Sequence, residues 1–116
     1  MPRSYWKLHL DAKKEESANK ILSKCIKLIG RPPIESEITK YSKGGYMADL
    51  QIYHHDQLSW PEIVIEVTGF GETLGGSWSL FGQINSNPNA VLSKESSNSR
   101  IVVPGLLWAT WEVINE

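Results

Sequence analysis

The sequence of 116 residues contains one cysteine, Cys25, so no disulfide can form within the chain. A lone cysteine favours a reducing compartment. No apolar run approaches the roughly 18 residues that a membrane-spanning helix needs. The first residues, MPRSYWKLHLD, also lack the apolar segment and the small-residue cleavage site of a secretory signal. We therefore expect a soluble, cytoplasmic protein with no membrane partner.

Basic residues are absent from a long central stretch. Residues 44–93 contain five acidic residues and neither lysine nor arginine, whereas residues 1–43 contain ten basic and five acidic residues. The net charge of −1 hides this asymmetry. A stretch of fifty residues without a basic residue is the most unusual feature of the sequence.

No strong catalytic or cofactor signature is present either. His54 and His55 are possible metal ligands, but adjacent residues of a strand point to opposite faces. Asp49 and Glu66 invite comparison with nucleases of the PD-(D/E)xK type, yet Thr68 stands where that motif needs lysine. We expect no enzymatic activity, no cofactor and no bound metal. An enzyme built around the two histidines and the nearby acids is a further alternative.

Residues 11–30, DAKKEESANKILSKCIKLIG, have the pattern of an amphipathic helix. Apolar residues recur every three to four positions, and five lysines occupy the other faces. Asp11 can cap the first turn, and Gly30 suits a left-handed end. Pro32 and Pro33 prevent any continuation. No other stretch has a comparable pattern, so the sequence predicts one helix.

The rest of the chain has the signals of strands and turns. Alternation predicts strands at residues 5–10, 34–41, 46–54, 62–68, 77–84 and 106–114, with short strands at 90–92 and 100–103. Short connections imply mostly antiparallel neighbours. We predict a single domain, residues 1–116, of the α+β class: one amphipathic helix packed on a curved, mostly antiparallel sheet of five to seven strands. This layout resembles cystatin-like folds more than the ferredoxin-like fold, which needs a second helix.

An acidic and aromatic sheet face is the candidate binding surface. If Leu50, Ile52, Ile63 and Ile65 face the helix, the pleat directs their neighbours to the other side. The predicted partner-binding residues are Asp49, Tyr53, His55, Glu62, Val64, Glu66, Glu72 and Phe81. Carboxylates between aromatic and apolar groups suit a protein partner, because the apolar groups are buried and the charges steer a basic protein.

The alternative is a nucleic-acid-binding module that uses the lysine-rich face of helix 11–30. Lysines on one helix face can contact phosphates. The pI of about 6.3 argues against this interpretation, so nucleic acid is the less expected partner. The sequence does not indicate an oligomeric state.

Several features of the chain occur together. It is a small single domain with one predicted helix on a sheet, five tryptophans, the acidic stretch 44–93, and the segments GGSWSL at 75–80 and LLWATW at 106–111. This set resembles a bacterial immunity protein, of the kind that neutralises a polymorphic or contact-dependent growth-inhibition toxin. The resemblance implies a non-enzymatic inhibitor that covers the active site or substrate-binding surface of a cognate toxin domain. Toxin nucleases are commonly basic, so an acidic inhibitor would gain in rate and affinity.

Overall fold

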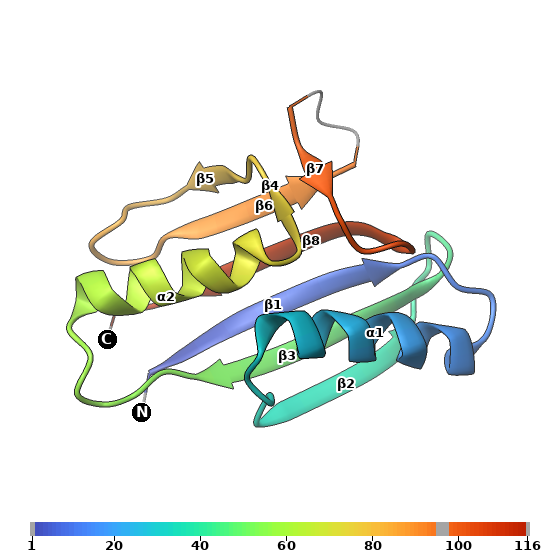
Figure 1. Ribbon diagram of the computed structural model, residues 1–116, viewed down its shortest axis with the longest axis horizontal. Coiled ribbons are helices and arrows are strands. Elements are labelled where there is room, and N and C mark those ends of the chain that lie inside the picture. Colours follow the sequence, from blue (N-terminus) through green and yellow to red (C-terminus); the bar gives the residue numbers. More distant parts are fainter. Residues whose placement is uncertain (1, 95–97, 116) are drawn as a thin grey trace.

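The computed structural model describes residues 2–94 and 98–115 and has the expected α+β architecture (Figure 1). In chain order the elements are β1 (Arg3–Leu10), α1 (Glu15–Ile29), β2 (Glu35–Lys40), β3 (Tyr46–Tyr53), α2 (Trp60–Glu72), β4 (Gly75–Gly76), β5 (Ser79–Phe81), β6 (Asn89–Ser93), β7 (Arg100–Ile101) and β8 (Leu106–Val113). Six strands form one sheet, and β4 pairs with β7 in a small second sheet. The prediction of a mostly antiparallel sheet is confirmed.

The six-stranded sheet has the order β2-β3-β1-β8-β6-β5, and every neighbouring pair is antiparallel. β1 and β2 are therefore parallel but separated by β3, and β3 and β8 are parallel but separated by β1. The chain passes through α1 between the first pair and through α2 between the second. This is the split βαβ arrangement of ferredoxin-like sheets, extended here by β6 and β5. The comparison with cystatin-like folds is wrong because the chain has the second helix.

α1 confirms the predicted helix but begins four residues later. Its N-cap is Lys14, which makes no side-chain capping bond. The backbone N–H of Asp11 donates to the carbonyl of Gly105, and the predicted cap at Asp11 is wrong. Gly30 ends the helix with a φ of 81°, as expected. Burial of the apolar stripe raises the pKa of the Cys25 thiol to about 12.

α2 occupies residues predicted to form a strand, so the expectation of a single helix is wrong. Residues 62–68, EIVIEVT, alternate and are rich in β-branched side chains, which favours a strand. The helix begins instead with a capping box. The Ser59 hydroxyl accepts a hydrogen bond from the backbone N–H of Glu62, and the Glu62 carboxylate accepts one from the N–H of Ser59. Ile63 and Val67, one turn apart, are buried.

The other strands are confirmed with changed bounds. Of the predicted strand 77–84, only Ser79–Phe81 pairs with β6, because left-handed backbone at Ser77 and Gly82 interrupts it on both sides. The short strands at 90–92 and 100–103 are present as β6 and β7. In β8 a bulge places Leu106 in the core, at the position that simple alternation assigns to Leu107.

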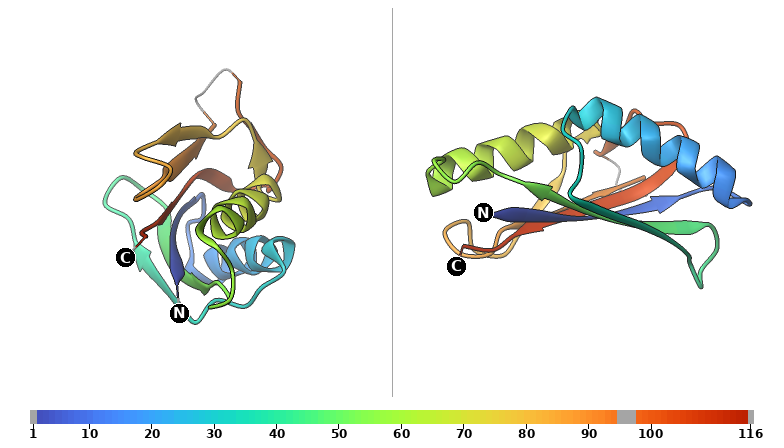
Figure 2. Two further views of the ribbon diagram at one scale, coloured as in Figure 1. Left: turned by 90° about the vertical axis from the view of Figure 1, so that its left-hand side faces the viewer. Right: turned by 90° about the horizontal axis from the view of Figure 1, so that it is seen from below.

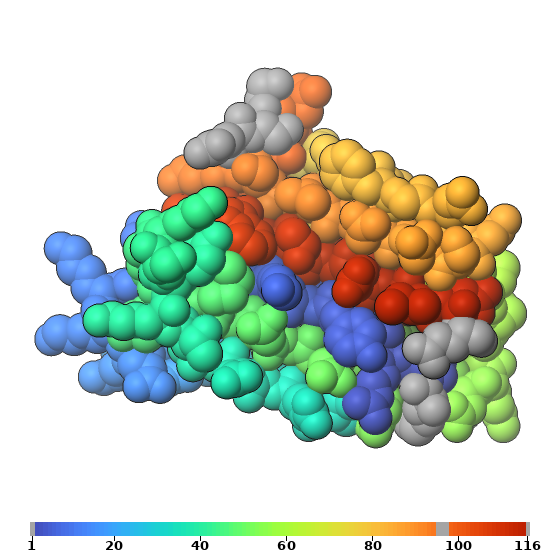
Figure 3. All heavy atoms as spheres, turned by 180° about the vertical axis from the view of Figure 1, so that it is seen from behind, coloured from blue at the N-terminus to red at the C-terminus, as the bar shows by residue number. Residues whose placement is uncertain are grey.

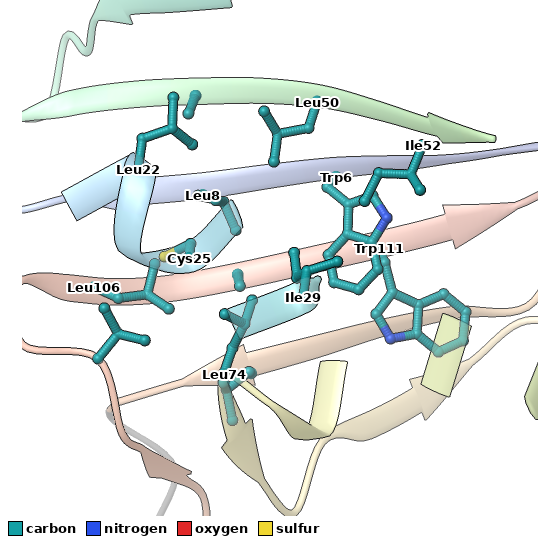
Figure 4. Packing of buried hydrophobic residues seen from close by; sticks show 14 of the residues in the cluster. Trp6, Leu8, Leu22, Cys25, Ile29, Leu50, Ile52, Leu74, Leu106 and Trp111 are labelled. Carbon is teal, nitrogen blue, oxygen red and sulfur yellow. The ribbon is translucent and has the colours of Figure 1, made fainter. Parts of the chain in front are cut away.

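Both helices cover the same face of the sheet, and the core lies between them and the strands (Figure 2). Their C-terminal ends are adjacent, because Arg31, just after α1, contacts Phe70 near the end of α2. Two tryptophans, Trp6 of β1 and Trp111 of β8, are almost fully buried beneath them. Figure 4 shows these rings with Cys25 and the leucine and isoleucine side chains of α1, β1 and β3. The opposite face of the sheet carries no helix in the described part of the chain.

Candidate partner-binding face

The uncovered face of the sheet presents the side chains that alternate with the core residues. We call it the open face. Figure 3 shows it from behind, with β2, β3, β1, β8, β6 and β5 side by side in that order. The strand register arranges its residues in rows across the sheet. From β2 to β5, the first row consists of Glu35, Gln51, Tyr5, Glu112, Asn89 and Phe81, and the second of Glu37, Asp49, Lys7, Thr110, Val91 and Ser79. The third row, from β2 to β6, consists of Thr39, Met47, His9, Trp108 and Ser93. A fourth row begins with Tyr53 and Arg3.

Polar contacts organise the β2–β3–β1 side of the open face. The Arg3 guanidinium donates to Gln51 Oε1 at 3.0 Å, and Gln51 Nε2 donates to Glu35 Oε2 at 3.1 Å. The same guanidinium lies 5.2 Å from the centroid of the Tyr53 ring. Because Arg3 is bonded and stacked in this way, the Gln51 amide and the tyrosine ring are held in fixed orientations.

Three carboxylates lie close together on adjacent strands of this side. Glu35 and Glu37 are exposed on β2, and Asp49 of β3 lies directly opposite Glu37. Lys7 of β1 lies on the other side of Asp49, so one cation stands beside these three carboxylates. Glu112 adds a fourth carboxylate on β8. The open face is therefore acidic at β2 and β3 and mixed in charge at its centre.

Aromatic rings form a cluster at the end of the open face near the β2–β3 turn. The His9 ring meets the Tyr41 ring edge-on, with 4.8 Å between centroids, and lies 5.6 Å from the Trp108 ring. His9 Nε2 also hydrogen-bonds the carbonyl of Gly44 at 2.9 Å. These contacts fix the imidazole between the two larger rings. Rigid, partly exposed aromatic groups of this kind are suited to anchor a protein partner.

The predicted partner-binding residues do not share one face. Asp49, Tyr53 and Phe81 lie on the open face, as expected. His55 is exposed in the loop after β3, where its Nδ1 accepts from the N–H of Gln57. Glu62, Val64, Glu66 and Glu72 lie on α2, on the opposite side of the sheet. The prediction of a common sheet face is wrong for these four because residues 60–72 are helical, and for His55 because β3 ends at Tyr53.

Glu66 belongs to a polar network beneath α2. Its carboxylate receives two hydrogen bonds from Arg31, at 2.6 and 3.3 Å, and contacts His54 Nδ1 at 2.7 Å. Arg31 also donates to the carbonyl of Tyr53 and covers the Phe70 ring at 5.0 Å. Partial burial acts to raise the pKa of Glu66, but the hydrogen bonds from Arg31 and His54 hold it below its usual value.

His54 is fully buried and connects this carboxylate to β1. Burial lowers the pKa of His54 and outweighs the hydrogen bond and charge of Glu66, which act to raise it. The neutral ring therefore donates from Nδ1 to Glu66 and accepts at Nε2 from the Ser4 hydroxyl, 2.8 Å away. The Ser4 oxygen in turn accepts from Trp6 Nε1 at 2.8 Å.

The order Ser4, His54 and Glu66 is that of a serine nucleophile, its base and an orienting acid. Ser4 is fully buried, however, and its oxygen is already occupied by the Trp6 indole. No substrate carbonyl can reach a hydroxyl in this position. The network therefore satisfies buried polar groups and fastens α2 and the end of α1 to β1 and β3.

Several residues of the open face were missed by sequence reasoning. Alternation already placed Tyr5, Lys7 and His9 on one side of β1, and Trp108 and Glu112 on one side of β8. What was missing was the pairing of β1 with both β3 and β8, which brings these residues beside Asp49 and Tyr53. The Arg31–Glu66 ion pair had no local signal, because it joins residues 35 positions apart.

No family model, curated protein or solved structure matches this chain. Within residues 2–94 and 98–115, no three histidine, cysteine or acidic side chains are grouped so that they could hold a metal ion. In the same residues, neither helix is long and apolar enough to cross a membrane.

Proposed function

We propose that this protein is an immunity-type inhibitor, which binds a basic toxin domain through the open face and covers its active site. The observation that supports the proposal is the composition of that uncovered face. It combines fixed aromatic groups, Tyr53 and the His9–Trp108 cluster, with the carboxylates of Glu35 and Glu37. A solvated sheet face needs no such aromatic groups, whereas an interface uses them as its buried anchors.

The two kinds of side chain have different tasks in this binding mode. The aromatic cluster would enter apolar recesses of the toxin and supply most of the affinity. The carboxylates on β2 and β3 would attract lysines and arginines that the toxin uses to hold a nucleic acid, and so raise the association rate. By occupying those cations, the inhibitor would exclude the substrate without any chemistry of its own.

A comparative capture experiment tests the proposal. The tagged wild-type protein and a Glu35→Lys, Asp49→Lys variant are incubated with lysate of the source organism, and bound proteins are quantified by mass spectrometry. We expect a basic protein that the wild type retains and the open-face variant loses. Glu16→Lys with Glu72→Lys is the matched control, since it changes the charge equally at exposed positions on the two helices. Its binding should equal that of the wild type.

The activity of the captured protein then tests the proposed inhibitory role. Its isolated toxic domain should arrest growth when expressed alone, and co-expression of the wild-type protein should restore growth. Co-expression of the open-face variant should restore it poorly. Equal capture by the two variants, or a captured protein whose domains are harmless, would contradict the proposal.

Nucleic-acid binding is the second candidate. All five lysines of residues 13–27 are exposed, which leaves a basic surface on the helix side of the molecule. Steeply salt-dependent binding of a labelled oligonucleotide, lost in a Lys20→Glu, Lys24→Glu variant, would favour this function. The open-face variant would then bind the oligonucleotide as well as the wild type does.

A further inference from the structure

A shallow apolar groove runs between α1 and the loop before β8. Its volume is about 460 Å³, and its floor is formed by Leu28, Val102, Val103 and Pro104. Leu28 is 46% exposed and Val102 is 52% exposed, so neither is covered within the chain. Lys24 and Lys27 form the rim on the α1 side. The groove therefore offers an apolar floor beside positive charge.

The exposed side of α2 has the opposite character. Ile65, at 71% exposure, projects from the helix. Glu62 precedes it by three residues and Glu72 follows it by seven, which places all three on the exposed side. Gly69, between them, carries no side chain that could keep another surface at a distance. α2 contains no basic residue, so this side presents Ile65 between the carboxylates of Glu62 and Glu72, and we call it the α2 ridge.

We propose that the groove of one copy of this chain receives the α2 ridge of a second copy. The apolar groups of the two surfaces match, and the lysines of the groove face the carboxylates of the ridge. Ile65 is the apolar anchor of this contact, and Glu62 and Glu72 lie three and seven positions from it on the same side of α2. The second copy is favoured over nucleic acid because phosphates gain nothing from a floor of leucine, valine and proline.

The arrangement of the helices permits both contacts at once. Groove and ridge lie on the same side of the sheet, because α1 and α2 cover one face with adjacent C-terminal ends (Figure 2). A two-fold axis through the helix layer would place each ridge in the other groove, which gives a closed dimer. The helix layer extends along the longest dimension of the molecule, 40 Å, which accommodates an interface of standard size. The open face stays free, so the dimer does not depend on the proposed function.

Disulfide trapping tests the contact directly. Ile65→Cys and Val102→Cys variants are prepared separately, mixed and exposed to mild oxidation. We expect a disulfide-linked pair in which one chain carries each substitution. The native Cys25 does not compete, because it is fully buried and its thiol pKa is raised to about 12. Ile84→Cys, exposed in the loop after β5, is the matched control and should not cross-link to Val102→Cys.

Sedimentation equilibrium tests the charges. The wild-type protein should associate with a dissociation constant that rises with salt and rises about tenfold in a Lys24→Glu, Lys27→Glu variant. The matched variant Lys13→Glu, Lys14→Glu has the same net charge and should associate like the wild type. Adding Glu72→Lys to the Lys24→Glu, Lys27→Glu variant should restore part of the association.

Three results would overturn the proposal. The first is a wild-type protein that stays monomeric up to about 0.5 mM, far above the range of specific interfaces of standard size. The second is cross-linking of Ile84→Cys at the same yield as Ile65→Cys. The third is a monomer whose Leu28 and Val102 methyl signals shift in NMR spectra on addition of an acidic amphipathic peptide, which would assign the groove to a foreign helix.

Discussion

The two helices lie on the same face of the sheet, yet only one of them is visible in the sequence. Eight of the fifteen residues of α1 are alanine, lysine, glutamate or leucine, which favour a helix, and none is glycine or proline. α2 contains valine, isoleucine, threonine and two glycines, which do not. The difference shows that α1 follows local preference, whereas α2 is helical because of what it contacts in the folded protein.

Three kinds of contact stabilise the helical conformation of α2. Its first turn has the capping box of Ser59 and Glu62, whereas α1 begins without a side-chain cap. Hydrogen bonds also fasten both ends of α2 to the following segment: Trp60 Nε1 donates to the carbonyl of Ile84, and Trp78 Nε1 donates to that of Gly71. On its inner side, Glu66 enters the buried network. Four predictions test this contrast, in order of decreasing effect.

Glu66→Lys should have the largest effect. It places a cation beside Arg31 and removes the acceptor of the buried His54 ring, so we expect the free energy of unfolding to fall by about 3 kcal/mol in urea denaturation. Glu72→Lys, exposed on the same helix, should change it by less than about 0.5 kcal/mol. Equal effects of the two substitutions would show that the network does not stabilise α2. Glu66 is therefore not a position at which to test partner binding.

Acid should weaken the docking of α2 through His54. The folded-state pKa of His54 lies below its ordinary value of 6.5, so the unfolded chain binds the proton more readily. Stability is therefore retained above pH 6.5 and decreases as the pH falls below it. Glu66, whose folded-state pKa is also lowered, adds to the loss only below about its ordinary value of 4.5.

Denaturation curves between pH 7.5 and pH 5 measure this dependence. A His54→Gln variant is less stable at neutral pH but should lose less stability on acidification, because the buried imidazole is gone. Parallel curves for the wild type and the variant would exclude His54 as the group that titrates.

The two glycines of α2 should respond in opposite ways. A Cβ at Gly69 meets no atom within 4 Å, so Gly69→Ala should raise the free energy of unfolding by about 1 kcal/mol. A Cβ at Gly71 would lie 3.1 Å from the Trp78 ring and 3.2 Å from that of Trp111, so Gly71→Ala should lower it by about 1 kcal/mol. Thermal unfolding distinguishes the two, and a gain at both positions would contradict the close packing at Gly71.

The helix caps should give effects no larger than those of the two glycines. Ser59→Ala removes the acceptor of the capping box and should cost about 1 kcal/mol, whereas Lys14→Ser supplies α1 with a cap and should add about 0.5 kcal/mol. Both are measured by urea denaturation at neutral pH. Lys13→Ser, one residue before the cap, is the control for Lys14→Ser and should have little effect. No gain from Lys14→Ser would mean that another group already satisfies the first turn of α1.

Much of the candidate site could be read from the sequence, but not its assembly. Alternation in β1 and β3 correctly placed Trp6, Leu8, Leu50 and Ile52 in the core. It thereby also placed their neighbours on the outer face, including Asp49 and Tyr53. The alternation of residues 62–68 led to the wrong face for Glu62, Val64 and Glu66, although SWPE at 59–62 carried the capping-box signal. Periodicity over seven residues cannot separate a β-branched helix from a strand.

The sequence by itself determined the α+β class, helix α1 with its end at Gly30, and the alternation of the main strands, because these depend on residues within a few positions of one another. Tertiary structure decided that residues 60–72 continue as a helix beyond the capping box at 59–62, that β1 lies between β3 and β8, and that Arg31, His54 and Glu66 meet. Those outcomes depend on contacts between distant parts of the chain. Burial of Ile63 and Val67 against the sheet outweighs the small preference of their β-branched side chains for a strand.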